Sequence, residues 1–298
     1  MTLKTTKKLR ALTAVALSAA MLVSFAACGT SDATDKDSGT SKTTTTGYDV
    51  SSVKKDAELA TLVEGNTVKD GELSVGMELS YAPAEFLAED GKTPTGYDVD
   101  ISKAIGNVLG LKTKIVSSTF DTIVPSVGSK YDLGITAMTI TKERMDSVDF
   151  VSYYRAGSTW TVQKGNPKKV DTSDLCGNKI AKQCEADGKK DAEVASYKRQ
   201  AEAATAVATG KADVFYADSP VAGYAISQTD GQLEALGKDV GVVKEGIAIQ
   251  KNNTKMATAV QKAVQKLMDD GTYMKILKHW GVESGALDKA EINPTDLD

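Results

Sequence analysis

The 298-residue sequence predicts an α/β protein that folds as two compact units. The chain is longer than a usual single domain, and its 41% hydrophobic residues suffice to build a real core. Strand-like and helix-like runs alternate along the chain, which is typical of α/β domains with a mostly parallel sheet. The same alternation starts again after Trp160. We therefore expect a second α/β unit behind the first.

The first residues have the order of a secretory signal, basic and then apolar. Lys4 to Arg10 is basic, Ala11 to Ala27 is apolar, and Cys28 follows. The end of the apolar run resembles the lipobox of bacterial lipoproteins, in which the cysteine is acylated and the chain is cut just before it. This predicts a signal peptide at 1–27 and lipidation of Cys28. A soluble export signal that ends near a cysteine is the alternative.

The residues after Cys28 predict a flexible tether over 28–52, because Ser, Thr, Asp, Gly and Lys cannot bury enough surface to offset the cost of ordering. The net charge is -4, and removing the four basic residues that precede Cys28 leaves -8. An acidic body without a basic patch is a poor nucleic-acid binder. We expect no nucleic-acid partner, and a body held outside the cytoplasmic membrane by its lipid.

The first unit begins with a short helix, and its later apolar positions alternate between strand and helix spacing. Gly110 ends the helix expected at 101–109. In order, we expect a helix near 54–63, a strand at 73–77, a helix at 101–109, a strand at 114–116, a short helix at 123–127, and a strand at 133–137.

The second unit and the C-terminal end follow the same logic. Two apolar stripes at helical spacing, separated by Gly271, predict packed C-terminal helices, and His279 beside the second stripe is expected to be a surface residue. The expected elements are strands at 178–181, 194–197 and 214–217, a helix at 200–208, and helices over 256–267 and 273–280.

Two cysteines remain in the exported body. Cys176 and Cys184 are predicted to close a small disulfide loop in an oxidising compartment. A metal site is the alternative, but the chain has one histidine and no Cys-x-x-Cys pair. We expect neither a metal nor another cofactor.

Short motifs follow one another in a fixed order across nearly all of residues 73–282. Each is weak alone, but their order and spacing together are specific. They are Leu73-Ser74-Val75-Gly76, Tyr81-Ala82-Pro83, Thr95-Gly96-Tyr97-Asp98-Val99-Asp100, Phe120-Asp121 with Pro125, Lys130-Tyr131-Asp132-Leu133, Thr139 to Arg144 with Val148-Asp149-Phe150, Gly210 to Asp213 with Asp218, Asp270 to Tyr273, and His279-Trp280-Gly281.

These motifs resemble the amino-acid-type extracellular solute-binding proteins (family 3) that deliver ligand to ABC importers. The resemblance implies a two-lobed, type II periplasmic-binding-protein-like fold whose lobes close on ligand by a hinge motion. It places lobe 1 at 53–160 plus 245–288 and an abbreviated lobe 2 at 161–244. The two hinge strands would be 159–164 and 245–250. The implied partners are a free polar amino acid, a basic one included, and an ABC transporter permease, and we expect a monomer.

The resemblance also implies a ligand site between the lobes. Arg144 would hold the ligand carboxylate with its planar fork, and Asp218 would hold the ammonium, because each buried charge is costly unless paired. Without the resemblance these two would be a solvated first-turn charge and a strand-end cap. The other implied ligand residues are Tyr81 and Phe120 as aromatic walls, Thr139 as a hydroxyl and amide donor, Ala137, and Glu78 facing the end of the side chain.

One departure from the family pattern concerns lobe 2. Relatives follow the strand corresponding to Ile180-Ala181 with a Gly-Ser/Thr-Thr turn and a helix that helps bind the carboxylate, whereas this chain runs on into Lys182 to Glu185. The departure keeps a surface receptor with a degraded cleft as an alternative. A dehydratase-like enzyme on the same fold is another, against which stand the lipobox and the absence of a Gly-x-Ser-x-Gly, Walker or metal motif. The expected protein is not an enzyme.

Overall fold

The computed structural model describes residues 46–173, 193–195, 197 and 200–297. Several expectations fall outside these residues: the signal peptide, Cys28 and most of the tether, Cys176 and Cys184, the strand at 178–181, and the missing turn after Ala181. Among the residues that are described, no helix is long and apolar enough to cross a membrane.

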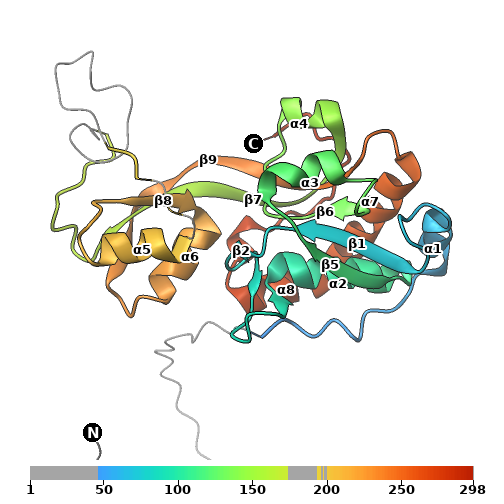
Figure 1. The fold of residues 1–298 in the computed structure, drawn as a ribbon, viewed down its shortest axis with the longest axis horizontal. Helices are drawn as coiled ribbons and strands as arrows, with labels where there is room; N and C mark the ends of the chain where they lie inside the picture. Colours follow the sequence, from blue (N-terminus) through green and yellow to red (C-terminus); the bar gives the residue numbers. More distant parts are fainter. Residues whose placement is uncertain (1–45, 174–192, 196, 198–199, 298) are drawn as a thin grey trace, which may run out of the picture. The chain divides into compact units, whose positions relative to one another are not determined.

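Six strands form one mixed sheet in the order β5-β1-β6-β9-β7-β8 (Figure 1). Strand β1 pairs in parallel with β5 and β6, while β9, β7 and β8 run antiparallel to their neighbours. A separate three-stranded sheet has the order β2-β3-β4. The strands are β1 (Glu72–Met77), β2 (Ser80–Tyr81), β3 (Glu85–Leu87), β4 (Pro94–Thr95), β5 (Lys112–Ser117), β6 (Leu133–Gly134), β7 (Val148–Gln163), β8 (Phe215–Asp218) and β9 (Leu233–Gln250).

The helices follow the apolar stripes of the sequence. Helix α2 ends where Gly110 adopts the left-handed conformation that glycine tolerates best, as expected. The helices are α1 (Ala57–Val63), α2 (Tyr97–Leu109), α3 (Phe120–Ser126), α4 (Lys142–Ser147), α5 (Gln200–Ala208), α6 (Ser219–Ser227), α7 (Thr254–Asp269), α8 (Thr272–Trp280) and the short 3-10 helix η2 (Glu283–Gly285).

Two buried clusters cover the two faces of the sheet in lobe 1. The larger one packs α1, α2, α7 and α8 against β1, β6 and β9, and a smaller one packs α3 and α4 on the opposite face. The alternation of side chains along a strand explains this division. In β7, Phe150 belongs to the smaller cluster and Val151 to the larger, and in β9 Ala248 and Ile249 divide in the same way.

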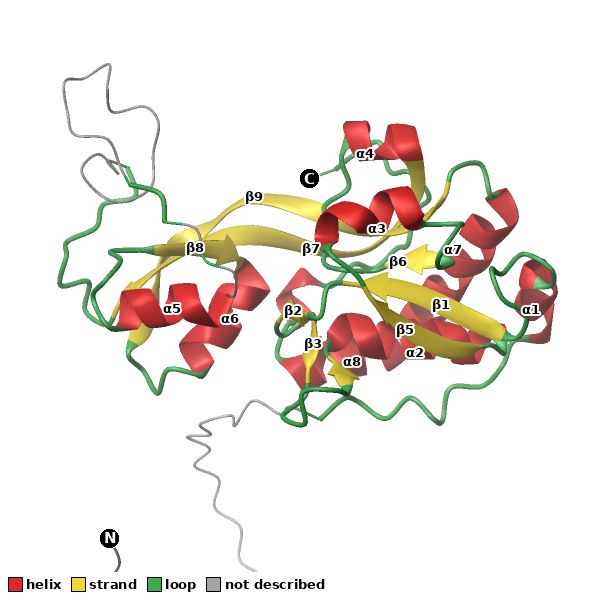
Figure 2. Ribbon diagram, in the orientation of Figure 1, coloured by secondary structure: helices red, strands yellow, loops and turns green. Residues whose placement is uncertain are grey.

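Strands β7 and β9 form a long antiparallel ribbon, visible in Figure 2, that pairs from Val148 with Gln250 to Gln163 with Leu233. The pairing register shifts three times along it, between Ser152 and Trp160. The two predicted hinge strands are therefore parts of longer strands. Beyond the shifts, α5, β8 and α6 pack on the ribbon around their own apolar cluster, which is the described part of lobe 2.

Some expectations were wrong in detail. Val194 is 68% exposed and the described residues of 194–197 form no strand, since this stretch buries no face. His279 is half-buried rather than a free surface residue, because its Nε2 lies 2.6 Å from the Thr46 carbonyl oxygen and its ring meets Trp280 edge-on. The end of the range assigned to the tether lies against the body, where Val50 is 6% exposed.

Candidate functional site

Two of the predicted ligand residues meet across the lobes. Tyr81 ends the short strand β2, and its hydroxyl donates a hydrogen bond of 2.5 Å to Oδ2 of Asp218, the last residue of β8. Burial raises the pKa of the Asp218 carboxyl, and the Tyr81 hydrogen bond opposes that rise. The tyrosine hydroxyl therefore occupies one oxygen of the carboxylate that was predicted to receive an ammonium group.

A second group of predicted residues surrounds the guanidinium of Arg144. Nη1 donates a 2.7 Å hydrogen bond to the Thr139 carbonyl oxygen, and Cζ lies 5.3 Å from the centre of the Phe120 ring. Helix α4 begins next to Thr141, whose hydroxyl accepts from the Arg144 amide, so the local cap fixes the base of the side chain. Burial lowers the pKa of Arg144, but from so high a usual value that the guanidinium stays cationic.

Phe120 and Arg144 line a shallow pocket of about 420 Å³ together with Asp121, Val124, Met138 and Thr141. The guanidinium carries five N–H donors, of which the backbone of Thr139 engages one within the described residues. Its remaining donors are sufficient for a bidentate carboxylate contact.

Glu245 lies between the two groups. Its backbone forms an isolated bridge with Thr139, and its side chain is close enough to Asp218 for their charges to interact. The other two predicted ligand residues, Ala137 and Glu78, form hydrogen bonds with side chains outside the predicted set. The Ala137 amide donates to Asp98 at 2.8 Å, and Oε1 of Glu78 accepts from the Ser80 hydroxyl at 2.8 Å.

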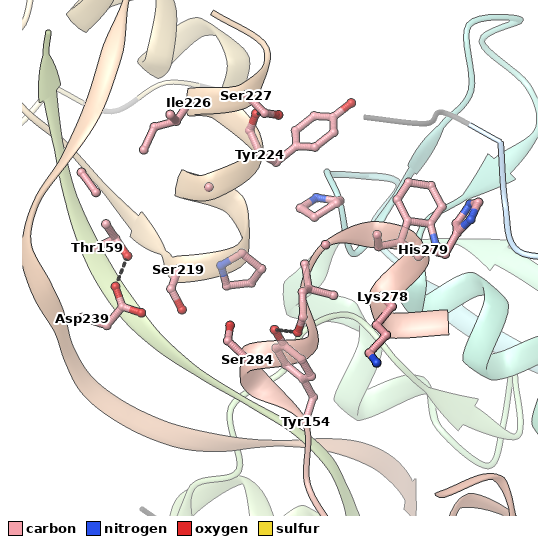
Figure 3. A pocket seen from close by; sticks show the side chains of 17 residues that line it. Tyr154, Thr159, Ser219, Tyr224, Ile226, Ser227, Asp239, Lys278, His279 and Ser284 are labelled. Atoms are coloured by element: carbon pink, nitrogen blue, oxygen red, sulfur yellow. Dashed lines mark hydrogen bonds between the residues drawn. The ribbon is translucent and has the colours of Figure 1, made fainter. Parts of the chain in front are cut away.

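A different cavity of about 450 Å³ contains none of the seven predicted ligand residues (Figure 3). It lies between α6 and the end of α8, and its lining includes Ser219, Tyr224, His279 and Ser284. A hydrogen bond between Thr159 and Asp239 joins β7 to β9 at its edge. The structure therefore places Ser219, and not its neighbour Asp218, on this cavity.

Sequence reasoning missed the buried carboxyls behind the predicted site. Glu85, Asp98 and Glu245 are each at most 1% exposed. The only available signal was an acidic residue within or beside a run of otherwise apolar positions, as in Glu245-Gly246-Ile247-Ala248. That signal does not reveal which acids meet, because the three belong to distant parts of the chain.

Comparison with known proteins agrees with this architecture. The model of the bacterial extracellular solute-binding proteins, family 3, matches residues 73–283. The arginine-binding protein ArgT of Corynebacterium glutamicum is 31% identical over 257 residues, covering 80% of this chain and 84% of the relative. The L-cystine-binding protein TcyJ of Escherichia coli is 28% identical, over 72% of this chain and 85% of the relative.

Solved structures give the same result. An ancestral arginine-binding protein bound to glutamine matches with a TM-score of 0.61 and 33% identity, over 72% of this chain and all of that one. The ancestral amino acid-binding protein AncCDT-1, described as a precursor of cyclohexadienyl dehydratase, matches with a TM-score of 0.62 and 30% identity, over 75% of this chain and 99% of that one. The two-lobed α/β fold and the match over most of the chain lead to one conclusion: this protein belongs to the bacterial extracellular solute-binding proteins of family 3.

Proposed function

We propose that this protein captures a free polar amino acid outside the cytoplasmic membrane and delivers it to an ABC importer, without chemistry on the ligand. The observation that carries the proposal is that two groups of opposite charge both lie near Glu245, which bridges to Thr139, the hydrogen-bond partner of Arg144, and is close enough to Asp218 for their charges to interact. Arg144 supplies an available guanidinium, and Asp218 supplies a half-buried carboxylate whose contact in the structure is a neutral hydroxyl. Together they match the carboxylate and ammonium of a zwitterion, whose charges must be paired on leaving water.

A basic amino acid is the best candidate ligand. Glu78 precedes β2, the strand that Tyr81 ends, and Asp218 bonds to Tyr81, so two carboxyl groups are predicted at the site against the guanidinium of Arg144. A second positive charge on the ligand would offset this excess. Relatives named for arginine, cystine and glutamine are consistent with a site of this general kind.

The location is proposed from the first residues of the chain. The basic and apolar segments followed by Cys28 favour export, cleavage before Cys28, acylation of its thiol and a monomeric body attached to the membrane by lipid. The family's description as extracellular supports the export step.

A ligand screen tests the binding proposal. The body from residue 29 onward is incubated with each of the twenty amino acids, and its melting temperature is recorded. Arginine, lysine or another polar amino acid should raise the melting temperature, because a ligand that binds only the folded state stabilises it. A protein that responds to none of the twenty would contradict amino-acid capture and favour the surface-receptor alternative.

The likeness to a dehydratase precursor makes an enzyme the second candidate. The same incubations decide between the two when products are analysed by mass spectrometry. A binding protein returns its ligand unchanged, whereas loss of water from a cyclic acid added as a further substrate would identify an enzyme.

A further inference from the structure

Three buried carboxyl groups lie behind the segment 136–139, which carries the predicted ligand residues Ala137 and Thr139. They are Glu85 from β3, Asp98 from α2 and Glu245 from β9. Glu85 and Asp98 are fully buried and Glu245 is 1% exposed. Acidic side chains are almost never buried to this degree unless they are paired.

Each carboxyl-bearing residue contacts that segment at a different point. The Thr136 hydroxyl donates to Oε1 of Glu85 at 2.6 Å, and the Ala137 amide donates to Oδ2 of Asp98 at 2.8 Å. Glu245 makes its contact through the backbone, as an isolated bridge to Thr139. Three elements that are distant in sequence therefore hold four consecutive residues.

The segment needs such support because of its backbone. Ala137 has a φ of 44°, in the left-handed region that residues with a Cβ rarely adopt. Such a conformation persists only when the surrounding structure fixes it. The hydrogen bond from the Ala137 amide to Asp98 is therefore a specific constraint on the strained residue.

The hydrogen bonds of the cluster indicate where protons reside. Asp98 accepts from the Tyr153 hydroxyl at 2.7 Å and from Ala137, so it is the acceptor of the cluster. Oε2 of Glu85 and Oε2 of Glu245 are buried without a hydrogen-bond partner among the described residues. A proton on Oε2 of Glu85 supplies the missing donor, directed at Asp98.

The surroundings favour the protonated forms. The titratable groups that act on the three carboxyls are the carboxyls themselves, Asp218 and the tyrosines, which include Tyr81, Tyr97 and Tyr153. Burial raises the pKa of Glu85 and of Glu245 well above the usual range, and raises that of Asp98 to about 6.

We propose that Glu85 and Glu245 hold protons inside lobe 1, that Asp98 is the acceptor of the cluster, and that all three are positioning residues that fix the segment 136–139 in its ligand-binding conformation. The part of this inference that concerns ligand rests on the proposed function. The part that concerns protons does not rest on it, because it follows from the contacts of these carboxyl groups inside the protein.

The sign of the pH effect follows from the raised pKa values. The folded chain keeps protons that the unfolded chain releases at ordinary carboxyl pKa values. The stabilisation is therefore complete below those ordinary values and is lost as pH rises from them to the folded-state pKa values, which are about 6 for Asp98 and well above the usual range for Glu85 and Glu245. Between pH 5 and 8 few other groups titrate, since the chain has a single histidine. The melting temperature should fall by at least about 4 °C over this range.

Glutamine variants test the proton. In Glu85→Gln the amide can accept from Thr136 and donate to Asp98 without a titrating proton, so its melting temperature should change with pH by clearly less than that of the wild type, while Glu245 keeps its own proton. Glu245→Gln should behave in the same way. Glu89→Gln is the matched control. Glu89 is exposed in the turn that follows β3, the strand of Glu85, so this variant should follow the wild type. Equal pH slopes in all four proteins would overturn the inference.

Binding measurements test the positioning. With the best amino acid from the screen, Glu85→Leu fills the space without hydrogen bonds and should lose at least about tenfold in affinity at pH 7, since a buried hydroxyl loses its partner. Glu85→Gln should recover most of that loss. Equal affinities of the leucine variant and the wild type would overturn the positioning role. A wild type that binds no amino acid would overturn the proposed function instead, and the pH slopes would still decide the inference.

Discussion

Within the described residues, the guanidinium of Arg144 donates one hydrogen bond, of 2.7 Å, to the carbonyl oxygen of Thr139. If Arg144 holds the ligand carboxylate, Arg144→Ala should weaken binding by at least about tenfold, because a lost charge-assisted pair costs about 2–5 kcal/mol. Arg144→Lys should restore binding only in part, since a point charge cannot make a bidentate contact. Calorimetry measures both, and the exposed Arg155→Ala serves as control. Unchanged affinity in Arg144→Ala would refute the assignment.

Asp218 has the complementary role, and its contact with Tyr81 gives a more discriminating prediction. The ligand ammonium must displace the Tyr81 hydroxyl from Oδ2. Tyr81→Phe keeps the aromatic wall and removes this competitor, so affinity should rise by about three- to tenfold, within what one hydrogen bond to a charged group contributes. Tyr81→Leu, which also loses the ring, should bind more weakly than the parent. Stopped-flow or calorimetric titration distinguishes them, and a fall in affinity for Tyr81→Phe would show that the hydroxyl serves the ligand directly.

The buried carboxylate of Asp100 is one of the groups that hold the segment around Tyr48 to the body. Oδ2 of Asp100 accepts from the Tyr48 amide at 2.7 Å and from the Trp280 indole at 2.8 Å. Burial raises the pKa of Asp100, and these donors oppose the rise. The end of the range predicted as the tether is thereby attached to α2 and α8.

Asp100→Ala should release this segment. Removing two hydrogen bonds to a charged group should increase cleavage around residues 46–50 by at least about tenfold, because proteolysis follows the population of the opened form. Limited proteolysis followed by mass spectrometry locates the cuts. Asp49→Ala is the control, since Asp49 bonds only to the neighbouring Ser51 amide among the described residues. Equal cleavage of the two variants would show that Asp100 does not hold the segment.

Helices were predictable from the sequence to a degree that strands were not. The stripe from Met256 to Leu267 falls within α7, and α5 has the predicted bounds, because burial of one helical face leaves a period of 3.6 residues in the sequence. Most of the ribbon left no such trace. Residues 236–242 of β9 are mostly exposed on both sides and include Gly237 and Gly241, so no alternation marks them as a strand.

The candidate site was predictable only as far as the motifs extend. Arg144, Thr139 and Phe120 meet because they are near in sequence or belong to neighbouring elements. The contact of Tyr81 with Asp218 and the meeting of Asp98 with Glu245 depend on how the ribbon folds back. Such contacts are set by tertiary packing, which a single sequence does not display.

At the scale of the whole molecule, the proposed attachment to the membrane depends on the first residues. Cys28→Ser should release the protein from the membrane fraction into the medium or the periplasm, because a polar tether has no affinity of its own for lipid. Cell fractionation with an antibody to the body measures this. As a control, Cys176→Ser should stay with the membrane, and a Cys28→Ser protein that also stays there would refute the lipid anchor.

The closed pairing of β7 with β9 has a consequence for how this protein could have been assembled. Gln163 at the end of β7 pairs with Leu233 at the start of β9, so the chain leaves the ribbon and enters it again at the same place. Neither the larger nor the smaller apolar cluster of lobe 1 includes a described residue from 164–232. To lobe 1, everything between these strands is equivalent to the loop of a long hairpin. A module of unrelated origin, or a tight turn, could occupy that place while the remaining chain keeps its core intact.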